Sequence, residues 1–152
     1  MGQQASLIVE TEIEAPVEVV KSLFKDFHRF KEWSSWSIDP AVHSKKMDDL
    51  IPKDKLSVDV KDLKFTATLL KNDLEAFEWS GGIWPLLTGE HEFSWRPSTT
   101  TQGGTTFRQR ENWRGLVASL WRPGRIMGKK TRKNFESFNA EVKEEAERRA
   151  AA

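Results

Sequence analysis

The sequence predicts an α+β fold in which a curved antiparallel β-sheet wraps around one long C-terminal helix. A strand-like segment opens the chain, five alternating segments follow in its middle, and a long charged helical segment closes it. Alternation of apolar and polar residues with a period of two is typical of an antiparallel sheet with one solvated face. At 152 residues, the chain is expected to form one domain over residues 1–152.

The opening segment predicts a strand followed by two short helices. Residues 6–14 alternate as a strand and stop at Ala15-Pro16, and proline suits the first turn of a helix. Residues 17–27 then carry apolar side chains at helical spacing, and residues 27–33 predict a second short helix. Residues 34–40 are turn-like and then extended, and the polar residues 43–54 are expected to form a loop.

The middle of the chain predicts five strands, at residues 55–60, 63–70, 75–79, 89–95 and 105–115. In the last of them one face carries Phe107, Gln109, Glu111 and Trp113. The opposite face carries arginines and is expected to be solvated. The sheet therefore has one apolar face that another element must cover.

The closing segment predicts a helix over residues 129–149, with an apolar stripe from Thr131 to Ala146 and a break before it at Pro123-Gly124. Residues 148–152 are expected to fray. A single helix about 10 Å wide cannot fill the whole concavity of a curved sheet. A cavity between the sheet and this helix is the expected consequence.

Composition excludes several classes of function. A formal net charge of +1 gives no general attraction to nucleic acid, and contact with a membrane is not expected. No apolar stretch approaches the ~20 residues of a membrane span. Without cysteine there are no disulfides or thiolate metal sites. No secretory signal is visible, which favours a cytoplasmic location. The opening M-G-x-x-x-S matches the pattern for myristoylation of Gly2, but a chance match before a first strand is the favoured explanation.

Four segments in order give a resemblance along nearly the whole chain. They contain Ala15-Pro16, Asp26 and Trp33; Trp79, Gly89, His91 and Phe93; Gly104, Thr105, Glu111 and Gly115; and Phe135, Asn139, Lys143 and Glu147. The chain resembles the START/Bet v 1-like helix-grip superfamily, in particular its polyketide cyclase/dehydrase-like (SRPBCC) branch. The resemblance implies a deep cavity between sheet and helix for small apolar or aromatic molecules. Cyclases of this type often use tyrosine or arginine in the pocket, and this chain has no tyrosine.

His91 and Glu111 are the candidate catalytic residues. Alternation places both on the inner face of the sheet, and opposed side chains of adjacent strands lie about 5 Å apart. A carboxylate there would favour the charged imidazole and orient its ring, as an acid/base pair requires. The alternative is a buried pair that only satisfies itself. No metal site is expected, because one histidine and one glutamate are too few ligands and His28 and His43 lie elsewhere.

A larger set of residues is expected to line the cavity and bind the ligand. Its members are Phe65, Phe77, Trp79, Trp84, Leu87, Phe93, Trp95, Phe107, Gln109, Trp113, Phe135 and Phe138. Flat aromatic walls suit aromatic ligands, but the same side chains could equally pack on the long helix. Trp84 lies in an unusually apolar turn, Ile83–Leu87, which is interpreted as a lid over the cavity mouth. The alternative is packing of this turn against Leu116–Trp121.

A basic run from Arg122 to Lys133 suggests contact with phosphate or an anionic surface, or simply a solvated helix face. No glycine-rich phosphate loop is present, and the arginines of residues 107–114 face away from the aromatic residues, which argues against nucleic acid.

Three functions follow from these observations. The first is binding of a small hydrophobic molecule, aromatic or polyketide-like, without a cofactor. The second is a cofactor-independent cyclase, dehydratase or isomerase that uses the same cavity. The third is an interaction protein that uses the Trp84 turn. The oligomeric state stays open.

Overall fold

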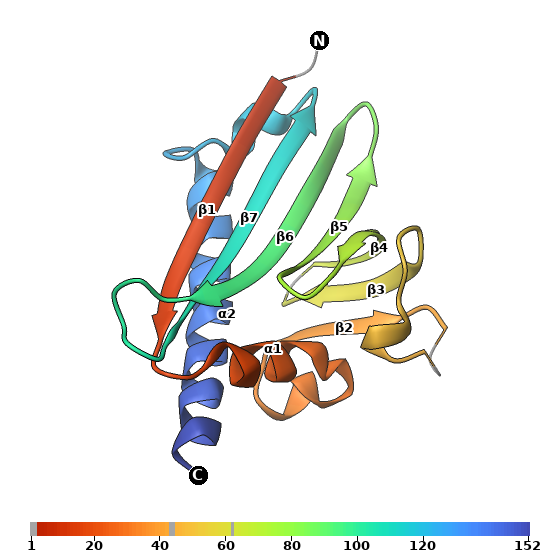
Figure 1. Ribbon diagram of the computed structural model, residues 1–152. Coiled ribbons are helices and arrows are strands. Elements are labelled where there is room, and N and C mark those ends of the chain that lie inside the picture. Colours follow the sequence, from red (N-terminus) through yellow and green to blue (C-terminus); the bar gives the residue numbers. More distant parts are fainter. Residues whose placement is uncertain (1–2, 43–44, 62) are drawn as a thin grey trace.

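The computed structural model describes residues 3–42, 45–61 and 63–152 as a seven-stranded antiparallel sheet curved around a long C-terminal helix (Figure 1). The strand order is β1-β7-β6-β5-β4-β3-β2, so the first strand pairs with the last and the edges are β1 and β2. The predicted fold class is confirmed.

The chain begins with β1 (Gln3–Ile13), α1 (Val17–Lys25) and the 3-10 helix η1 (Phe27–Glu32). Pro16 precedes α1, and its carbonyl oxygen accepts hydrogen bonds from the amides of Val19 and Val20. The extended segment that follows is a true edge strand, β2 (Trp36–Pro40). A single 3-10 turn, η2 (Met47–Asp49), lies in the region expected to be a loop. Gly2 and His43 lie outside the described residues.

Five strands follow as consecutive hairpins: β3 (Lys55–Val60), β4 (Lys64–Asn72), β5 (Ala76–Ile83), β6 (Leu87–Pro97) and β7 (Thr105–Gly115). β5 and β6 run further toward their shared turn than the sequence predicts, up to an Ile83–Leu87 pair. Backbone pairing needs no alternation of side chains, which explains why the pattern missed these ends. The register sets His91 opposite Glu111, as predicted, and Gly81 opposite Gly89.

The chain ends with the 3-10 helix η3 (Ala118–Trp121) and the long helix α2 (Ile126–Ala151), which crosses the concave face of the sheet (Figure 1). Pro123-Gly124 separates the two helices, as expected for a helix-breaking pair. α2 begins at Ile126 rather than at Lys129 and continues to Ala151, through the residues expected to fray. Its buried face includes Phe135, Phe138, Val142 and Ala146.

An aromatic core fills the end of the fold where α1 and η1 meet the sheet. Phe24 of α1 packs on Phe93 with ring centroids 4.8 Å apart, and Trp36 stacks on Phe138 at 4.2 Å. Phe30, Phe77 and Phe107 are also fully buried. This half of the space between sheet and α2 is solid.

The convex face is less solvated than the alternation predicts. Glu92 is buried there, and its carboxylate lies 3.2 Å from Lys71 Nζ and 3.4 Å from both Arg108 Nη2 and Arg110 Nη2. Neighbouring strands bring these long side chains together over one acid, so their aliphatic stems cover it. The face is therefore an ion-pair network and not a set of independent solvated arginines.

Candidate functional site

A cavity of about 650 Å³ occupies the other half of the space between the sheet and α2. Its inner wall is formed by Phe65, Trp79, Leu87, Trp113 and Phe135. Ligand pockets typically measure about 300–1,000 Å³ and are lined mainly by apolar side chains. The predicted cavity between the sheet and the C-terminal helix is therefore present. It lies next to the aromatic core and does not extend over the whole concave face.

Two glycines explain why this half is hollow. Gly81 of β5 and Gly89 of β6 pair across the sheet, and both line the cavity. Alternation along β5 and β6 gives large inner-face residues elsewhere, including Phe77, Trp79 and Phe93. At this one cross-strand pair no side chain rises from the sheet toward α2. The cavity is a consequence of where the glycines fall in register.

His91 lies at the inner end of the cavity, packed between two phenylalanine rings. Its imidazole stacks on Phe93 at a centroid distance of 4.3 Å and on Phe135 at 4.6 Å. Nε2 lies 2.8 Å from Gln109 Oε1, and Nδ1 lies 3.4 Å from Glu111 Oε1. The histidine is only 2% exposed, so its ring is held on all sides.

A chain of buried amides fixes the tautomer of this histidine. Gln109 Nε2 donates to the Phe135 carbonyl oxygen (3.1 Å) and to Asn139 Oδ1 (2.7 Å), and Asn139 Nδ2 donates to Thr11 Oγ1 (3.1 Å). Gln109 Oε1 is therefore an acceptor, and His91 Nε2 must carry the proton. Nδ1 is left as the acceptor that faces Glu111.

Burial keeps both members of the pair neutral near pH 7. It lowers the pKa of His91 to about 3, against the opposing effect of the Gln109 hydrogen bond, and raises the pKa of Glu111 to about 8. The expectation of a charged imidazole beside a carboxylate is thus wrong, because desolvation outweighs the attraction of the two charges here. Glu111 is a carboxylic acid whose proton can be directed to Nδ1.

Both residues line the cavity, and Glu111 is the more exposed member of the pair. Its side chain is 16% exposed, against 3% for that of His91. Its second oxygen, Oε2, lies over Gly89, where a β-carbon would sit only 2.3 Å away. Any other residue at position 89 would displace this carboxyl group. The site therefore presents one protonated acid beside the apolar inner wall of the cavity.

The predicted ligand-binding residues separate into two groups. Phe65, Trp79, Leu87, Trp113 and Phe135 line the cavity, together with His91 and Glu111. The others on the concave face do not: Gln109 belongs to the amide chain, and the remaining side chains fill the aromatic core, namely Phe77, Phe93, Trp95, Phe107 and Phe138. The alternation of apolar and polar residues predicted correctly that these side chains lie on the concave face. It does not tell which of them lie at the cavity and which lie in the core, because that depends on their position along the strands.

Trp84 does not lie where a lid would. It is 64% exposed and is not part of the cavity wall. The turn instead packs on the segment after β7, because the Pro85 and Leu86 carbonyl oxygens accept hydrogen bonds from the amides of Leu116 and Val117. Gly115 permits this approach, since its φ is +128° and a β-carbon there would lie 2.4 Å from Leu86 O. The turn thus packs against the Leu116–Trp121 segment, which was the alternative predicted from the sequence.

Several residues that line the cavity were not predicted from the sequence. They come from the β3–β4 turn, from η3 and from the first turns of α2, and include Lys61, Leu63, Trp121, Met127, Lys130, Lys133 and Asn134. Two of them, Lys130 and Lys133, belong to the basic run from Arg122 to Lys133, for which the sequence predicts contact with phosphate or a solvated helix face. Only the fold shows that Lys130 and Lys133 border the cavity.

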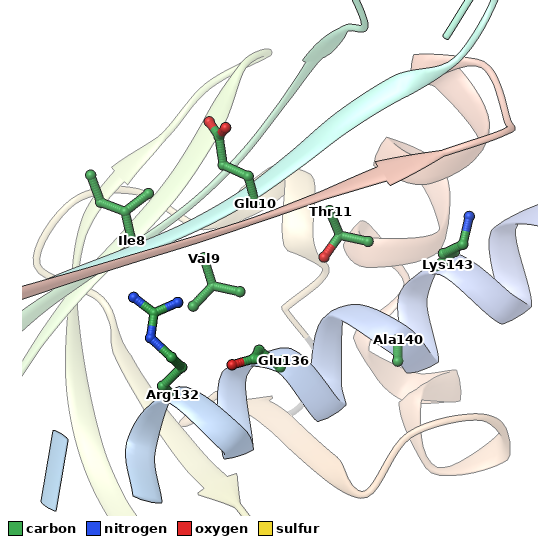
Figure 2. A pocket seen from close by; sticks show the side chains of 8 residues that line it. All are labelled: Ile8, Val9, Glu10, Thr11, Arg132, Glu136, Ala140 and Lys143. Atoms are coloured by element: carbon green, nitrogen blue, oxygen red, sulfur yellow. The ribbon is translucent and has the colours of Figure 1, made fainter. Parts of the chain in front are cut away.

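A second, more open hollow lies between β1 and α2 and measures about 380 Å³ (Figure 2). Figure 2 shows Val9 and Thr11 pointing toward the helix, while Ile8 and Glu10 point away from it. Arg132, Glu136 and Lys143 supply charges along the helix side. This groove is suited to water and ions and not to an apolar molecule.

Neither a metal centre nor a membrane span is found in the part of the chain that the structure describes. Among these residues no three of His, Asp and Glu come together as metal ligands. None of the described helices has the length and apolarity needed to cross a bilayer.

Fold and cavity together define a helix-grip protein of the START/Bet v 1 class. The chain belongs to the family described as polyketide cyclase/dehydrase and lipid transport, whose model matches residues 4–147. A comparison with curated proteins finds no match.

Solved structures share the fold at low sequence identity. A START superfamily protein from Mycobacterium smegmatis has a TM-score of 0.59 at 14% identity, with 96% of this chain and 97% of that chain covered. Norcoclaurine synthase from Thalictrum flavum gives 0.67 at 7% identity, covering 96% of each chain. The hypothetical protein jhp0584 from Helicobacter pylori gives 0.67 at 8%, covering 95% and 88%. At these identities the similarity concerns the fold alone.

Proposed function

We propose that the protein binds a small hydrophobic molecule, aromatic or polyketide-like, in the cavity between the sheet and α2. The observation that carries this proposal is the apolar hollow of about 650 Å³ beside a fully packed core. An apolar cavity inside a domain lowers the free energy of unfolding, so a cavity of this size favours a role in ligand binding. Indole and phenyl walls from Trp79, Trp113 and Phe135 suit a flat ring system.

Filling the cavity from α2 tests this function. Thr131 lines the cavity, whereas Ala140 lies on the same helix beside the open groove of Figure 2. We expect Thr131→Trp to abolish binding of apolar aromatic compounds measured by changes in tryptophan fluorescence, and Ala140→Trp to retain it. Equal binding by both variants, or no binding of any compound in a panel of polyketides, flavonoids, sterols and lipids by the native protein, would refute the proposal.

A second candidate function is that of a cofactor-independent cyclase, dehydratase or isomerase. The observation in its favour is Glu111, an acid kept protonated by burial with one oxygen at the cavity wall. Such a group can protonate a carbonyl or a leaving hydroxyl while the apolar wall holds the substrate in one reactive conformation. His91 is then a positioning residue, with its Nδ1 3.4 Å from Glu111 Oε1.

The isosteric variant Glu111→Gln separates the enzyme from the binder. If the protein is a dehydratase, this variant keeps its affinity for apolar ligands and loses turnover of β-hydroxy aryl ketones to enones, followed by absorbance. Turnover equal to that of the native protein would exclude Glu111 as the acid. An absence of turnover in the native protein favours the binding function alone.

A further inference from the structure

Three lysines border the mouth of the cavity and come from two sides. Lys61 lies in the turn between β3 and β4, and Lys130 and Lys133 lie on α2. A hydrogen bond of 3.1 Å from Asn134 Nδ2 to the Val60 carbonyl oxygen joins the two sides. The lysine side chains are exposed at the rim, while the apolar wall lies behind them.

The charge of these lysines is not balanced inside the cavity. Among the described residues, the other ionisable side chains that line it are His91 and Glu111, which lie at its inner end. Within residues 3–42, 45–61 and 63–152, none of the three lysines forms an ion pair with a carboxylate. An apolar cavity with three lysines at its mouth is complementary to a ligand that has an apolar body and an anionic group at one end.

We infer that the ligand is an amphipathic anion, with its apolar body in the cavity and its carboxylate, sulfonate or phosphate group at Lys61, Lys130 and Lys133. This inference rests on the proposed binding function and adds the chemical class of the ligand. A cationic ligand would be repelled at the mouth, and a neutral one would gain nothing there. Partial exposure of the lysines makes each contribution modest and sensitive to salt.

Two fluorescent probes that differ only in one sulfonate test the inference. 8-Anilinonaphthalene-1-sulfonate carries the anion, and 1-anilinonaphthalene has the same ring skeleton without it. We expect the sulfonate to bind the native protein about tenfold more tightly, which corresponds to three surface ion pairs at roughly 0.5 kcal/mol each. The difference should shrink as the salt concentration rises.

Matched charge variants locate the effect. Replacing Lys61, Lys130 and Lys133 by Gln should bring the affinity for the sulfonate down to that for the neutral probe and leave the neutral probe unchanged. Replacing three lysines away from the cavity wall, Lys21, Lys31 and Lys129, changes the net charge equally and should have little effect.

Three other outcomes of these binding measurements would each overturn a different part of the proposal. Equal affinities of the two probes for the native protein would overturn the anionic class and leave the binding function intact. Equal losses in both charge variants would assign the effect to the net charge and overturn the role of the mouth. A failure of both probes to bind would refute the binding function itself.

A separate observation concerns the end of the molecule where the β5–β6 turn, the end of β7, η3 and the start of α2 lie together (Figure 1). Six large apolar side chains are exposed in these segments: Ile83, Trp84, Leu86, Leu116, Leu120 and Ile126. We call them the apolar end. Clusters of this kind on a folded domain mark interaction sites.

The charge around the apolar end identifies the partner. Residues 114–133 contain seven Arg or Lys and no Asp or Glu. Although the net charge of +1 predicts no attraction to membranes, this segment concentrates positive charge beside exposed apolar residues. We propose that the apolar end inserts into the surface of an anionic lipid bilayer, since such a surface favours exposed apolar side chains that have basic residues near them in the chain.

Vesicle sedimentation tests this surface. The native protein should sediment with vesicles that contain phosphatidylserine and not with pure phosphatidylcholine vesicles. Trp84→Ser/Leu86→Ser should remove most of the binding, whereas Ile51→Ser/Leu74→Ser, at exposed apolar positions elsewhere, should not. Equal binding by both double variants would overturn the proposal. Concentration-dependent self-association that only the first variant abolishes, without vesicle binding, would instead assign the apolar end to a protein interface.

Discussion

At the scale of single residues, Glu111 and His91 determine what chemistry the cavity can offer. The amide chain from Asn139 through Gln109 leaves His91 Nδ1 as an acceptor, and burial favours a proton on Glu111. The pair can therefore hold one proton between two neutral groups without a buried charge, whose cost in an apolar site would be several kcal/mol. Alternation predicted that the residues face each other, but not their protonation, because desolvation depends on the surrounding rings.

Glu111→Gln should change how the free energy of unfolding depends on pH. The folded state holds the Glu111 proton up to about pH 8, and the unfolded chain releases it near pH 4.5. Between these values the folded state binds more protons, so this group lowers stability as pH rises, by at most about 1.4 kcal/mol per pH unit. Urea unfolding at pH 5.5 and pH 8 should show the variant gaining stability relative to the native protein at the higher pH. A constant difference would mean that Glu111 is ionised in the folded protein.

Gly89→Ala should displace the Glu111 carboxyl group, because its β-carbon would lie 2.3 Å from Oε2. We expect a loss of about 1–3 kcal/mol in the free energy of unfolding, as is typical of overpacking. Gly81→Ala is the matched control on the paired strand, where the new carbon meets only the Phe65 ring at 3.1 Å. A similar small cost for both would contradict the described position of the carboxyl group.

At the scale of elements, β5, β6 and α2 decide which part of the concave face is solid and which is hollow. The Gly81–Gly89 pair removes side chains from two neighbouring strands at one level. The Trp79–His91 pair follows on the same face, and beyond it Phe93 and Phe138 belong to the packed core. Both glycines can be read from the sequence, but their alignment cannot. Their alignment depends on the register of the β5–β6 hairpin, which the unexpected extension of both strands toward Trp84 determines.

Two aromatic truncations should distinguish the core from the apolar end. Phe138→Ala removes a fully buried ring from α2 and should cost about 3–5 kcal/mol in the free energy of unfolding. Trp84→Ala removes an exposed indole and should change it by no more than about 0.5 kcal/mol. Chemical denaturation measures both. A large loss for Trp84→Ala would show that its side chain is packed, contrary to the structure.

At the scale of the whole molecule, the space between the sheet and α2 is part packed core and part apolar cavity. Sequence patterns predicted the element order, the concave face and the existence of a gap, because periodicity and length determine these. They did not predict where the core ends, because that follows from strand pairing over long distances. They also did not predict that Lys61 and Lys130 border one mouth, because that follows from the packing of α2 against the sheet. The twelve predicted ligand residues therefore divide between cavity, core and surface.

The most direct measurement is a crystal structure with a brominated naphthoate, whose bromine can be located by anomalous scattering. The central claim predicts a bromine peak in the cavity among Trp79, Trp113 and Phe135, with the carboxylate toward the lysines. A peak only in the groove beside Ala140, or no peak at saturating concentration with the cavity walls collapsed together, would contradict it.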